Sequence, residues 1–203
     1  MKLNLGCGSQ VPDGWVNVDY SLGARFAKIP LFTLINRKLK LFDLNWDSRI
    51  YIHDLTKRFP WNDGSIDVVY ISFVLEYFTR DEGRTFLAEC HRVLKKNGLI
   101  RMLIWDLRYI VNEYVTGRLP ADDFIGELCV LQGHHANRIK NHLYPFIQLP
   151  AKCMYDATRL IEILNDIGFT AVSKNAFESE IDDITRIEQQ CTEDVVIVEG
   201  RKR

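Results

Sequence analysis

Residues 2–19 read KLNLGCGSQVPDGWVNVD, a stretch in which two short apolar runs are separated by glycine turns. Residues 2–5 and 15–18 have the length and composition of β-strands. A Gly-Cys-Gly turn follows the first run and a Pro-Asp-Gly turn precedes the second, and both are strong turn signals. The stretch therefore predicts two neighbouring strands, the second of which ends at Asp19.

The rest of the chain continues as alternating strands and helices. Phe86, Cys90, Val93 and Leu94 share one helical face, and that helix is expected to stop at Asn97-Gly98. A second amphipathic helix is expected between a cap at Asp156 and a stop at Gly168. Further strands are expected at residues 51–53, 67–71, 99–104, 170–173 and 195–198. This alternation predicts an α/β fold, with a parallel sheet and helices on both of its faces.

Composition excludes several classes of protein. The 203 residues fit one domain over 1–203, and 26 basic against 27 acidic side chains disfavour a nucleic-acid partner, unless a local patch such as 138–140 provides one. Five cysteines without a CxxC pair indicate neither a disulfide framework nor a zinc site, so no metal is expected. No run reaches the roughly 20 apolar residues of a membrane span, so a cytoplasmic protein is expected.

Ligands of open α/β sheets bind beyond the carboxyl ends of the strands. The residues expected at those ends are the glycine turn at 6–8, Asp19, Asp54, Ser72 and Asp106. Glycine lets the backbone approach a ligand and offers N–H groups to a carboxylate or phosphate. Asp19 stands where nucleotide-binding sheets place an acid for ribose hydroxyls, and Asp54 could accept a hydrogen bond from an exocyclic amine. Together these residues indicate a nucleoside site.

Longer motifs extend this pattern. They are LNLGCGS at 3–9, GWVNVD at 14–19, HDL at 53–55, FPW at 59–61, DGSIDVVY at 63–70, SFVLEYF at 72–78, ECHRVLKKNG at 89–98, MYD at 154–156 and IGF at 167–169. The set resembles the class I S-adenosylmethionine-dependent methyltransferases, most closely the small type 11 kind, over residues 2–107 and 154–172. The resemblance implies a Rossmann-like sheet of about seven strands, mostly parallel with a C-terminal antiparallel strand.

The same resemblance implies a function and a set of cofactor contacts. The chain would transfer a methyl group from S-adenosylmethionine to a small or medium-sized acceptor by in-line displacement, with S-adenosylhomocysteine as the other product. The glycine turn would face the amino-acid end of the cofactor, Asp19 its ribose and Asp54 its adenine amine. The expected cofactor residues are Asn4, Leu5, Gly6, Cys7, Gly8, Asp19, Tyr20, His53, Asp54, Leu55, Ser72 and Phe73.

Three departures from the family pattern keep other functions open. Asn4 stands where an acid is usual, ten residues separate Gly8 from Asp19, and Phe73 and Tyr77 stand where relatives commonly carry histidines. One alternative is an aminopropyltransferase-like enzyme on the same fold, which would prefer a decarboxylated cofactor. The other is a non-catalytic cofactor-binding or scaffold protein, which would form no methylated product.

Residues 107–154 lack strand patterning and are expected to form a lid or an acceptor site. His134, His135 and His142 are candidate bases in that segment, and Asp106 just before it could orient an acceptor. The alternatives are a polar loop for the three histidines and a helix cap for Asp106.

Residues 21–48 are expected to form a helical insertion. Its part at 22–40 mixes apolar and basic side chains. Such a segment could lie on a membrane surface as a peripheral contact, or it could pack on the sheet as an amphipathic helix with a solvated basic face.

Overall fold

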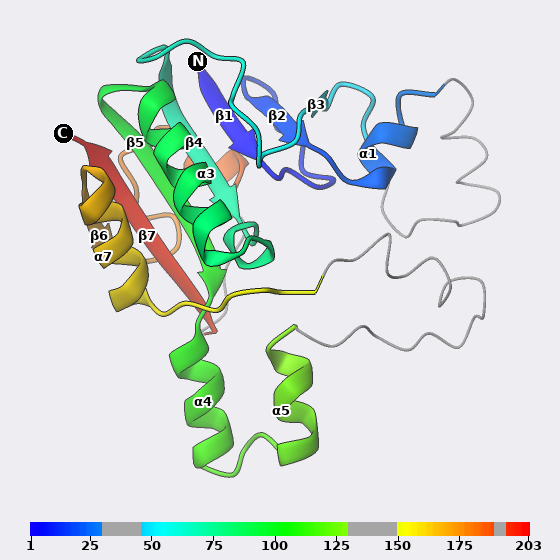
Figure 1. The fold of residues 1–203 in the computed structure, drawn as a ribbon, viewed down its shortest axis with the longest axis vertical. Helices are drawn as coiled ribbons and strands as arrows, with labels where there is room; N and C mark the ends of the chain where they lie inside the picture. Colours follow the sequence, from blue (N-terminus) through cyan, green and yellow to red (C-terminus); the bar gives the residue numbers. More distant parts are fainter. Residues whose placement is uncertain (30–45, 130–149, 189–193) are drawn as a thin grey trace.

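The computed structural model describes residues 1–29, 46–129, 150–188 and 194–203. They form a seven-stranded sheet in the order β3-β2-β1-β4-β5-β7-β6 (Figure 1). The strands are β1 (Lys2–Leu5), β2 (Val16–Asp19), β3 (Tyr51–Ile52), β4 (Ile66–Ser72), β5 (Leu94–Trp105), β6 (Phe169–Ser173) and β7 (Val195–Lys202). Every strand expected from the sequence is therefore present, with some ends shifted.

The direction of the strands matches the expected fold class. Neighbouring strands from β3 to β5 run parallel, whereas β7 runs antiparallel to both β5 and β6. Central strands such as β4 are buried on both faces, which accounts for their continuous apolar sequence. The Rossmann-like sheet, mostly parallel with an antiparallel C-terminal strand, is confirmed.

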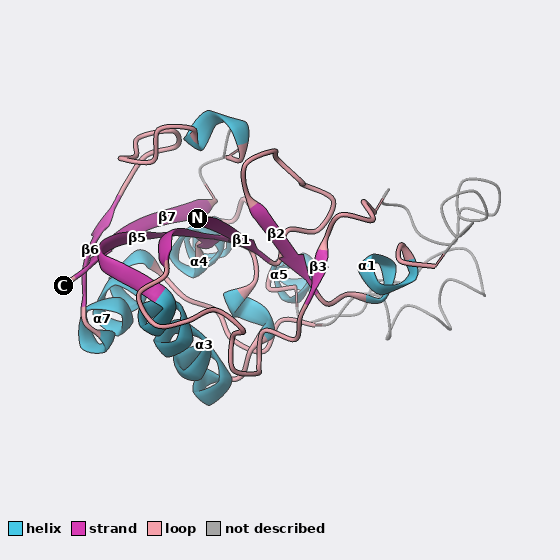
Figure 2. Cartoon of the chain, turned by 90° about the horizontal axis from the view of Figure 1, so that it is seen from above, coloured by secondary structure: helices cyan, strands magenta, loops and turns pink. Residues whose placement is uncertain are grey.

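Two amphipathic helices cover one face of the sheet, α3 (Arg80–Val93) and α7 (Ala157–Ile167) (Figure 2). Their buried residues, among them Phe86 and Leu164, join the larger apolar core with β1, β4 and β5. The apolar side chains of both helices recur at helical spacing, and the polar sides face outward. The sequence periodicity therefore indicates which side of each helix packs on the sheet.

The ends of these helices are set by side chains next to them. Thr79 and Glu82 form a reciprocal capping box at the start of α3. Asp156 caps α7 by accepting a hydrogen bond from the Arg159 N–H at 2.8 Å, and Gly168 ends it with a left-handed φ of 119°. The expected cap and stop of α7 are both confirmed.

The opposite face is covered by residues 174–188, which contain the short 3-10 helix η2 (Ile184–Arg186) (Figure 2). Ile181, Ile184 and Ile187 are buried there in a second apolar cluster that includes Trp15 and Tyr70. This layer is mostly irregular backbone, so its attachment depends on more than helical periodicity.

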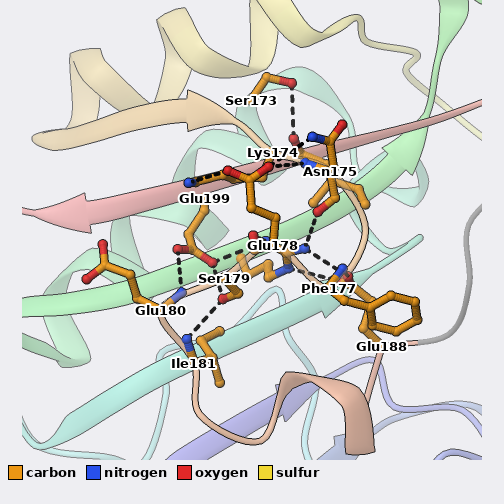
Figure 3. A network of polar contacts seen from close by, with 12 residues as sticks. Ser173, Lys174, Asn175, Phe177, Glu178, Ser179, Glu180, Ile181, Glu188 and Glu199 are labelled. Carbon is orange, nitrogen blue, oxygen red and sulfur yellow. Dashed lines mark hydrogen bonds and ion pairs between the residues drawn. The ribbon is translucent and has the colours of Figure 1, made fainter.

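Arg101 in β5 attaches that layer through a network of hydrogen bonds. Figure 3 shows the labelled acids of this region, among them Glu188 and Glu199, with the polar contacts around them. The buried guanidinium of Arg101 donates to both carboxylate oxygens of Glu188 at 2.6 and 2.8 Å, and to Glu199 at 3.2 Å. It also donates to the carbonyls of Asn175 at 3.0 Å and Glu178 at 2.9 Å. These five bonds use every N–H that a guanidinium has, which is what a charge in the interior requires.

The remaining described helices are α1 (Leu22–Phe26), the 3-10 helix η1 (Leu75–Tyr77), α4 (Leu107–Val115) and α5 (Ala121–Glu127). In Figure 1, α4 and α5 lie next to each other beyond the carboxyl end of β5. The ring of Tyr114 on α4 packs against that of Phe124 on α5, with 4.9 Å between the ring centroids. Of the expected insertion at 21–48, residues 30–45 lie outside the described part. Within the described residues, no helix has the length and apolar character needed to cross a membrane.

One expected boundary is wrong. The helix α3 ends at Val93, before the Asn97-Gly98 stop that its sequence suggests. Leu94 already has extended backbone and pairs with Ile66 of β4, because its fully buried side chain belongs to the core of the sheet. Asn97 adopts a left-handed φ of 62° within the first part of β5.

Candidate functional site

The order in which successive strands are added to the sheet reverses between β1 and β4. From β1 the chain continues to β2 and β3 on one side, and from β4 it continues to β5 on the other. In open α/β sheets this switch point leaves a crevice at the carboxyl ends of the strands, where ligands bind. The residues at and just beyond the carboxyl ends of β1, β2, β3 and β4 therefore form the candidate site.

The glycine turn after β1 has two glycines with different surroundings. Gly6 and Gly8 both have left-handed backbone, with φ of 70° and 55°. A Cβ on Gly6 would come within 2.2 Å of the Val74 side chain, which follows β4, whereas a Cβ on Gly8 would meet nothing within 4 Å. Gly6 is therefore required by packing between two strand ends, and Gly8 is the glycine that borders open space.

Two buried amides hold this turn. Asn4 of β1 lies opposite Asn17 of β2, and its amide donates to the Asn17 side-chain oxygen at 2.9 Å and to the Gln10 carbonyl at 3.0 Å. The Asn17 amide donates in turn to the carbonyls of Pro12 and Trp15. Both N–H groups of Asn4 are thus used within the connection between the strands, so its amide shapes the turn.

Asp19 ends β2 and connects the glycine turn to α1. Its carboxylate accepts hydrogen bonds from the Gly8 N–H at 2.9 Å and from the Ser21 N–H at 2.7 Å. The residue is 8% exposed. A carboxylate has about four acceptor positions, so two backbone bonds orient it and leave capacity for further donors.

The end of β3 carries His53, Asp54 and Leu55. Asp54 is partly buried, which opposes ionisation, but the hydroxyl and the N–H of Thr56 donate to it at 2.7 and 2.9 Å and the pKa of Asp54 is lowered overall. Leu55 is buried beside it. The His53 Nε2 is buried near the Trp61 ring and has no hydrogen-bond partner among the described residues. This end of the sheet thus offers an ionised acceptor, an apolar surface and an unsatisfied nitrogen.

The ends of β4 and β5 are joined by an aromatic stack. Phe73 follows Ser72, and its ring stacks on that of Trp105, the last residue of β5, with 4.4 Å between centroids. The Phe73 N–H donates to the Leu103 carbonyl, and its φ is 53°. A left-handed backbone is costly for a bulky residue, and such strain is concentrated at functional sites.

Glu76 in η1 is a buried acid that the sequence reading does not select. One carboxylate oxygen accepts the Trp105 N–H at 3.0 Å, and the other is buried without a partner in the described part of the chain. Its carbonyl accepts the N–H groups of Lys152 and Cys153. Burial raises the pKa of Glu76 to about 7. The one sequence signal for Glu76 is its position within the SFVLEYF motif at 72–78, and the residues of that motif do not indicate that its carboxylate is buried.

Comparison with known proteins identifies the sheet. Residues 3–102, about half of the chain, match the family model described as a methyltransferase domain. Residues 3–102 belong to the methyltransferase domain family. A comparison with curated proteins returns no match.

Solved structures share the fold of this methyltransferase domain at low sequence identity. A SAM-dependent methyltransferase from Methanosarcina mazei has 12% identity and a TM-score of 0.53, and the alignment covers 99% of this chain and 91% of that one. The YcgJ protein from Bacillus subtilis has 11% identity and a TM-score of 0.52, with 100% and 91% covered. The PH0226 protein from Pyrococcus horikoshii has 15% identity and a TM-score of 0.52, with 100% and 81% covered.

The candidate catalytic residues of the methyltransferase domain are placed only in part. Asp106 accepts the Arg108 N–H at 2.9 Å and is the N-cap of α4, so the capping alternative is confirmed. His134, His135 and His142 lie outside the described residues. Burial raises the pKa of the Cys7 thiol to about 12, which keeps it protonated. Tyr20 is half exposed beneath the Arg25 guanidinium, 5.1 Å from its ring.

S-adenosylmethionine is the cofactor of this methyltransferase family. The chemistry of the strand ends fits its groups. The open position at Gly8 accommodates close approach of a ligand to backbone, and Asp19 retains acceptor capacity for hydroxyls. The ionised Asp54 beside buried Leu55 suits an amine on an apolar ring.

Proposed function

We propose that the chain is an S-adenosylmethionine-dependent methyltransferase that acts on a small or medium-sized acceptor. The observation that carries this proposal is the order of the strand ends. The glycine turn follows β1 and Asp54 follows β3, whereas Asp19 and Ser72 are the last residues of β2 and β4. These four strands are neighbours in the sheet. Polar groups that are distant in sequence are thereby placed along one crevice at the switch point.

Each part of that crevice has a proposed task. The backbone at Gly8 would meet the amino-acid end of the cofactor, and Asp19 would accept from the ribose hydroxyls. Asp54 would accept from the adenine amine while Leu55 packs on the ring. Ser72 and Phe73 would line the methionine part, where the Phe73–Trp105 stack fixes the wall.

The chemistry needs positioning more than proton transfer. When bound, S-adenosylmethionine would supply a methyl group on a positively charged sulfur, so that an acceptor lone pair could form a bond to the methyl carbon in line as the carbon–sulfur bond breaks and S-adenosylhomocysteine leaves. The chain's contribution is to hold donor and acceptor in that geometry, which can supply a large share of the rate. A base is needed only for an acceptor that carries a proton at the working pH.

Binding of S-adenosylhomocysteine tests the proposal by calorimetry. We expect saturable binding to the full chain, and Asp19→Ala should weaken it by about 1–3 kcal/mol because bonds to a buried carboxylate are lost. Asp166→Ala is the matched control, since this exposed aspartate lies on α7, away from the strand ends. Absence of binding at millimolar ligand, or equal effects of the two variants, would contradict the proposed site.

We further propose that the chain works in the cytoplasm. The cysteines at 7, 90, 129 and 153 are free thiols, which supports the proposal of a reducing compartment such as the cytoplasm.

A further inference from the structure

Glu76 of η1 joins three segments of the chain at the carboxyl ends of β4 and β5. One oxygen of its carboxylate accepts the N–H of Trp105, the last residue of β5, at 3.0 Å. Its carbonyl accepts the N–H groups of Lys152 and Cys153 at 2.7 and 3.1 Å. Those two residues belong to the segment that runs past the end of β5 into α7 (Figure 1). A residue that is only 2% exposed therefore connects the loop after β4 with two other parts of the chain.

Trp105 extends this connection to the wall of the proposed cofactor crevice. Its ring stacks on that of Phe73, with 4.4 Å between the centroids and 27° between the ring planes. Phe73 has a left-handed φ of 53°, and its N–H donates to the Leu103 carbonyl at 2.9 Å. Phe73 and Glu76 lie in the same loop after β4, so the contacts close on themselves: from the acid to the tryptophan, from there to the phenylalanine, and back along the chain. The position of the carboxyl therefore affects the position of the stack.

The other oxygen of the Glu76 carboxylate is buried and has no hydrogen-bond partner among the described residues. A buried polar atom without a partner is costly, and the cost is far larger for an ionised carboxylate than for a neutral carboxyl. Within the described part of the chain Glu76 forms no ion pair, and the ammonium of the neighbouring Lys152 binds Glu82 at 3.3 Å instead. The surroundings of this carboxyl therefore favour its neutral form.

The titratable groups near Glu76 do not compensate a charge on it. Burial raises the pKa of the Tyr155 hydroxyl and of the Cys129 thiol, and a negative charge on Glu76 raises both further. The other titratable or charged groups that act on this pair are Cys153, Arg80 and Glu127. Burial raises the pKa of Glu76 itself to about 7, so its carboxyl passes from neutral to ionised between pH 6 and pH 8.

We propose that Glu76 is a positioning residue for the methionine part of the cofactor: its neutral carboxyl holds Trp105, and through Trp105 the Phe73 ring, in the arrangement that binds. The inference rests on the proposed function, because it concerns the wall of that same crevice. When the carboxyl ionises, it is drawn toward water and releases the Trp105 N–H, so the stack loses its fixed position. The protonated form is therefore the one that binds.

Calorimetry with S-adenosylhomocysteine on the full chain at pH 6 and pH 8 tests this. If only the neutral form binds, a pKa of about 7 makes binding about tenfold weaker at pH 8 than at pH 6. Glu76→Gln keeps an oxygen for the Trp105 N–H and has no proton to lose, so it should bind at both pH values as the unmodified chain does at pH 6. Glu76→Leu removes the acceptor and should bind weakly at both.

The matched control is Glu162→Gln, which changes an exposed acid on α7. It should retain the tenfold dependence on pH. Circular dichroism at both pH values shows that each variant is folded, so that a change in affinity is separated from a change in stability. The proposal is overturned if Glu76→Gln has the same pH dependence as the unmodified chain, or if the unmodified chain has none.

The unmodified chain offers a second measurement that does not depend on the folding of any variant. The backbone amide resonance of Trp105, observed by NMR on nitrogen-15-labelled protein, should shift between pH 6 and pH 8 with a midpoint near 7. Saturation with S-adenosylhomocysteine should move that midpoint upward, because a ligand that selects the neutral form favours the bound proton. A resonance that does not titrate, or a midpoint that moves downward, contradicts the assigned role.

The same data separate the two levels of inference. If S-adenosylhomocysteine binds equally well at both pH values, the role of Glu76 is wrong and the proposed function stands. If S-adenosylhomocysteine binds at neither pH, the proposed function fails, and the role of Glu76 fails with it.

Discussion

The two faces of the sheet are covered in opposite ways. On one face, α3 and α7 bury apolar side chains at helical spacing, in a cluster that includes Phe86 and Leu164. On the other, residues 174–188 are mostly irregular and are held through the buried Arg101, which binds Glu188 and Glu199. Both layers contain apolar residues, but among the residues that the structure describes the fully buried ion pairs belong to the second.

The difference teaches how stability is distributed over the molecule. An apolar helix face loses free energy gradually when a side chain is shortened, because the loss scales with the cavity that is left. A buried ion network fails abruptly, because removal of one charge leaves its partners unpaired in the interior. The second face should therefore be the more sensitive to single polar substitutions.

The largest effect is expected from Arg101→Met. The substitution leaves the buried carboxylates of Glu188 and Glu199 without their counter-charge, and we expect a loss of about 3–5 kcal/mol in the free energy of unfolding, measured with urea. Arg186→Met is the control, because this exposed arginine belongs to the same layer and should change stability by less than about 0.5 kcal/mol. Equal losses in both variants would remove the distinction between the two faces.

A smaller effect is expected from Glu76→Gln, which concerns a buried acid with no ion-pair partner among the described residues. Burial raises the pKa of Glu76 to about 7, so the folded chain retains a proton that the unfolded chain releases above its ordinary pKa of 4.5. Stability should therefore decrease as the pH rises from about 5 to 8. The variant, which has no proton to lose, should escape a decrease of about 2–3 kcal/mol.

Urea unfolding at pH 5 and pH 8 measures this difference. The two proteins should be similar at pH 5, and the variant should be the more stable at pH 8. Glu162→Gln, on the exposed side of α7, is the control and should follow the unmodified chain at both pH values. Parallel pH profiles for Glu76→Gln and the unmodified chain would show that this carboxyl is ionised in both states.

The smallest effect is expected from Thr79→Ala at the start of α3. It removes one half of the capping box with Glu82, and we expect a loss of about 1 kcal/mol by urea unfolding. Thr85→Ala in the same helix is the control, because its hydroxyl only donates to the Asp81 carbonyl of the preceding turn. A loss at Thr79 as large as that at Arg101 would mean that the two faces do not differ in kind.

Much of the sheet and of the candidate site could be predicted from local sequence. The strands, the cap at Asp156, the stop at Gly168 and the acids at strand ends each depend on neighbouring residues, so short patterns reveal them. The end of α3 could not be found in this way. Leu94 leaves the helix because it pairs with Ile66, and that contact belongs to the tertiary fold.

The role of Arg101 could not be predicted from local sequence patterns for a related reason. The sequence from Leu99 to Trp105 reads as an apolar strand with one arginine, and nothing nearby tells that its charge is buried. The isoleucines at 181, 184 and 187 are likewise scattered through a stretch that reads as polar. Similarly, position 6 requires glycine because the Val74 side chain packs against it, and rules for turns consider only neighbouring residues.

The reach of the Arg101 network has a consequence for how the chain folds during synthesis. The groups that bind this guanidinium lie 74 to 98 residues further along the chain. When β5 leaves the ribosome, the arginine therefore has no partner from this network. The central strands are expected to remain loosely associated until Glu188 and Glu199 arrive, so that residues made late determine when the first half of the molecule becomes fixed.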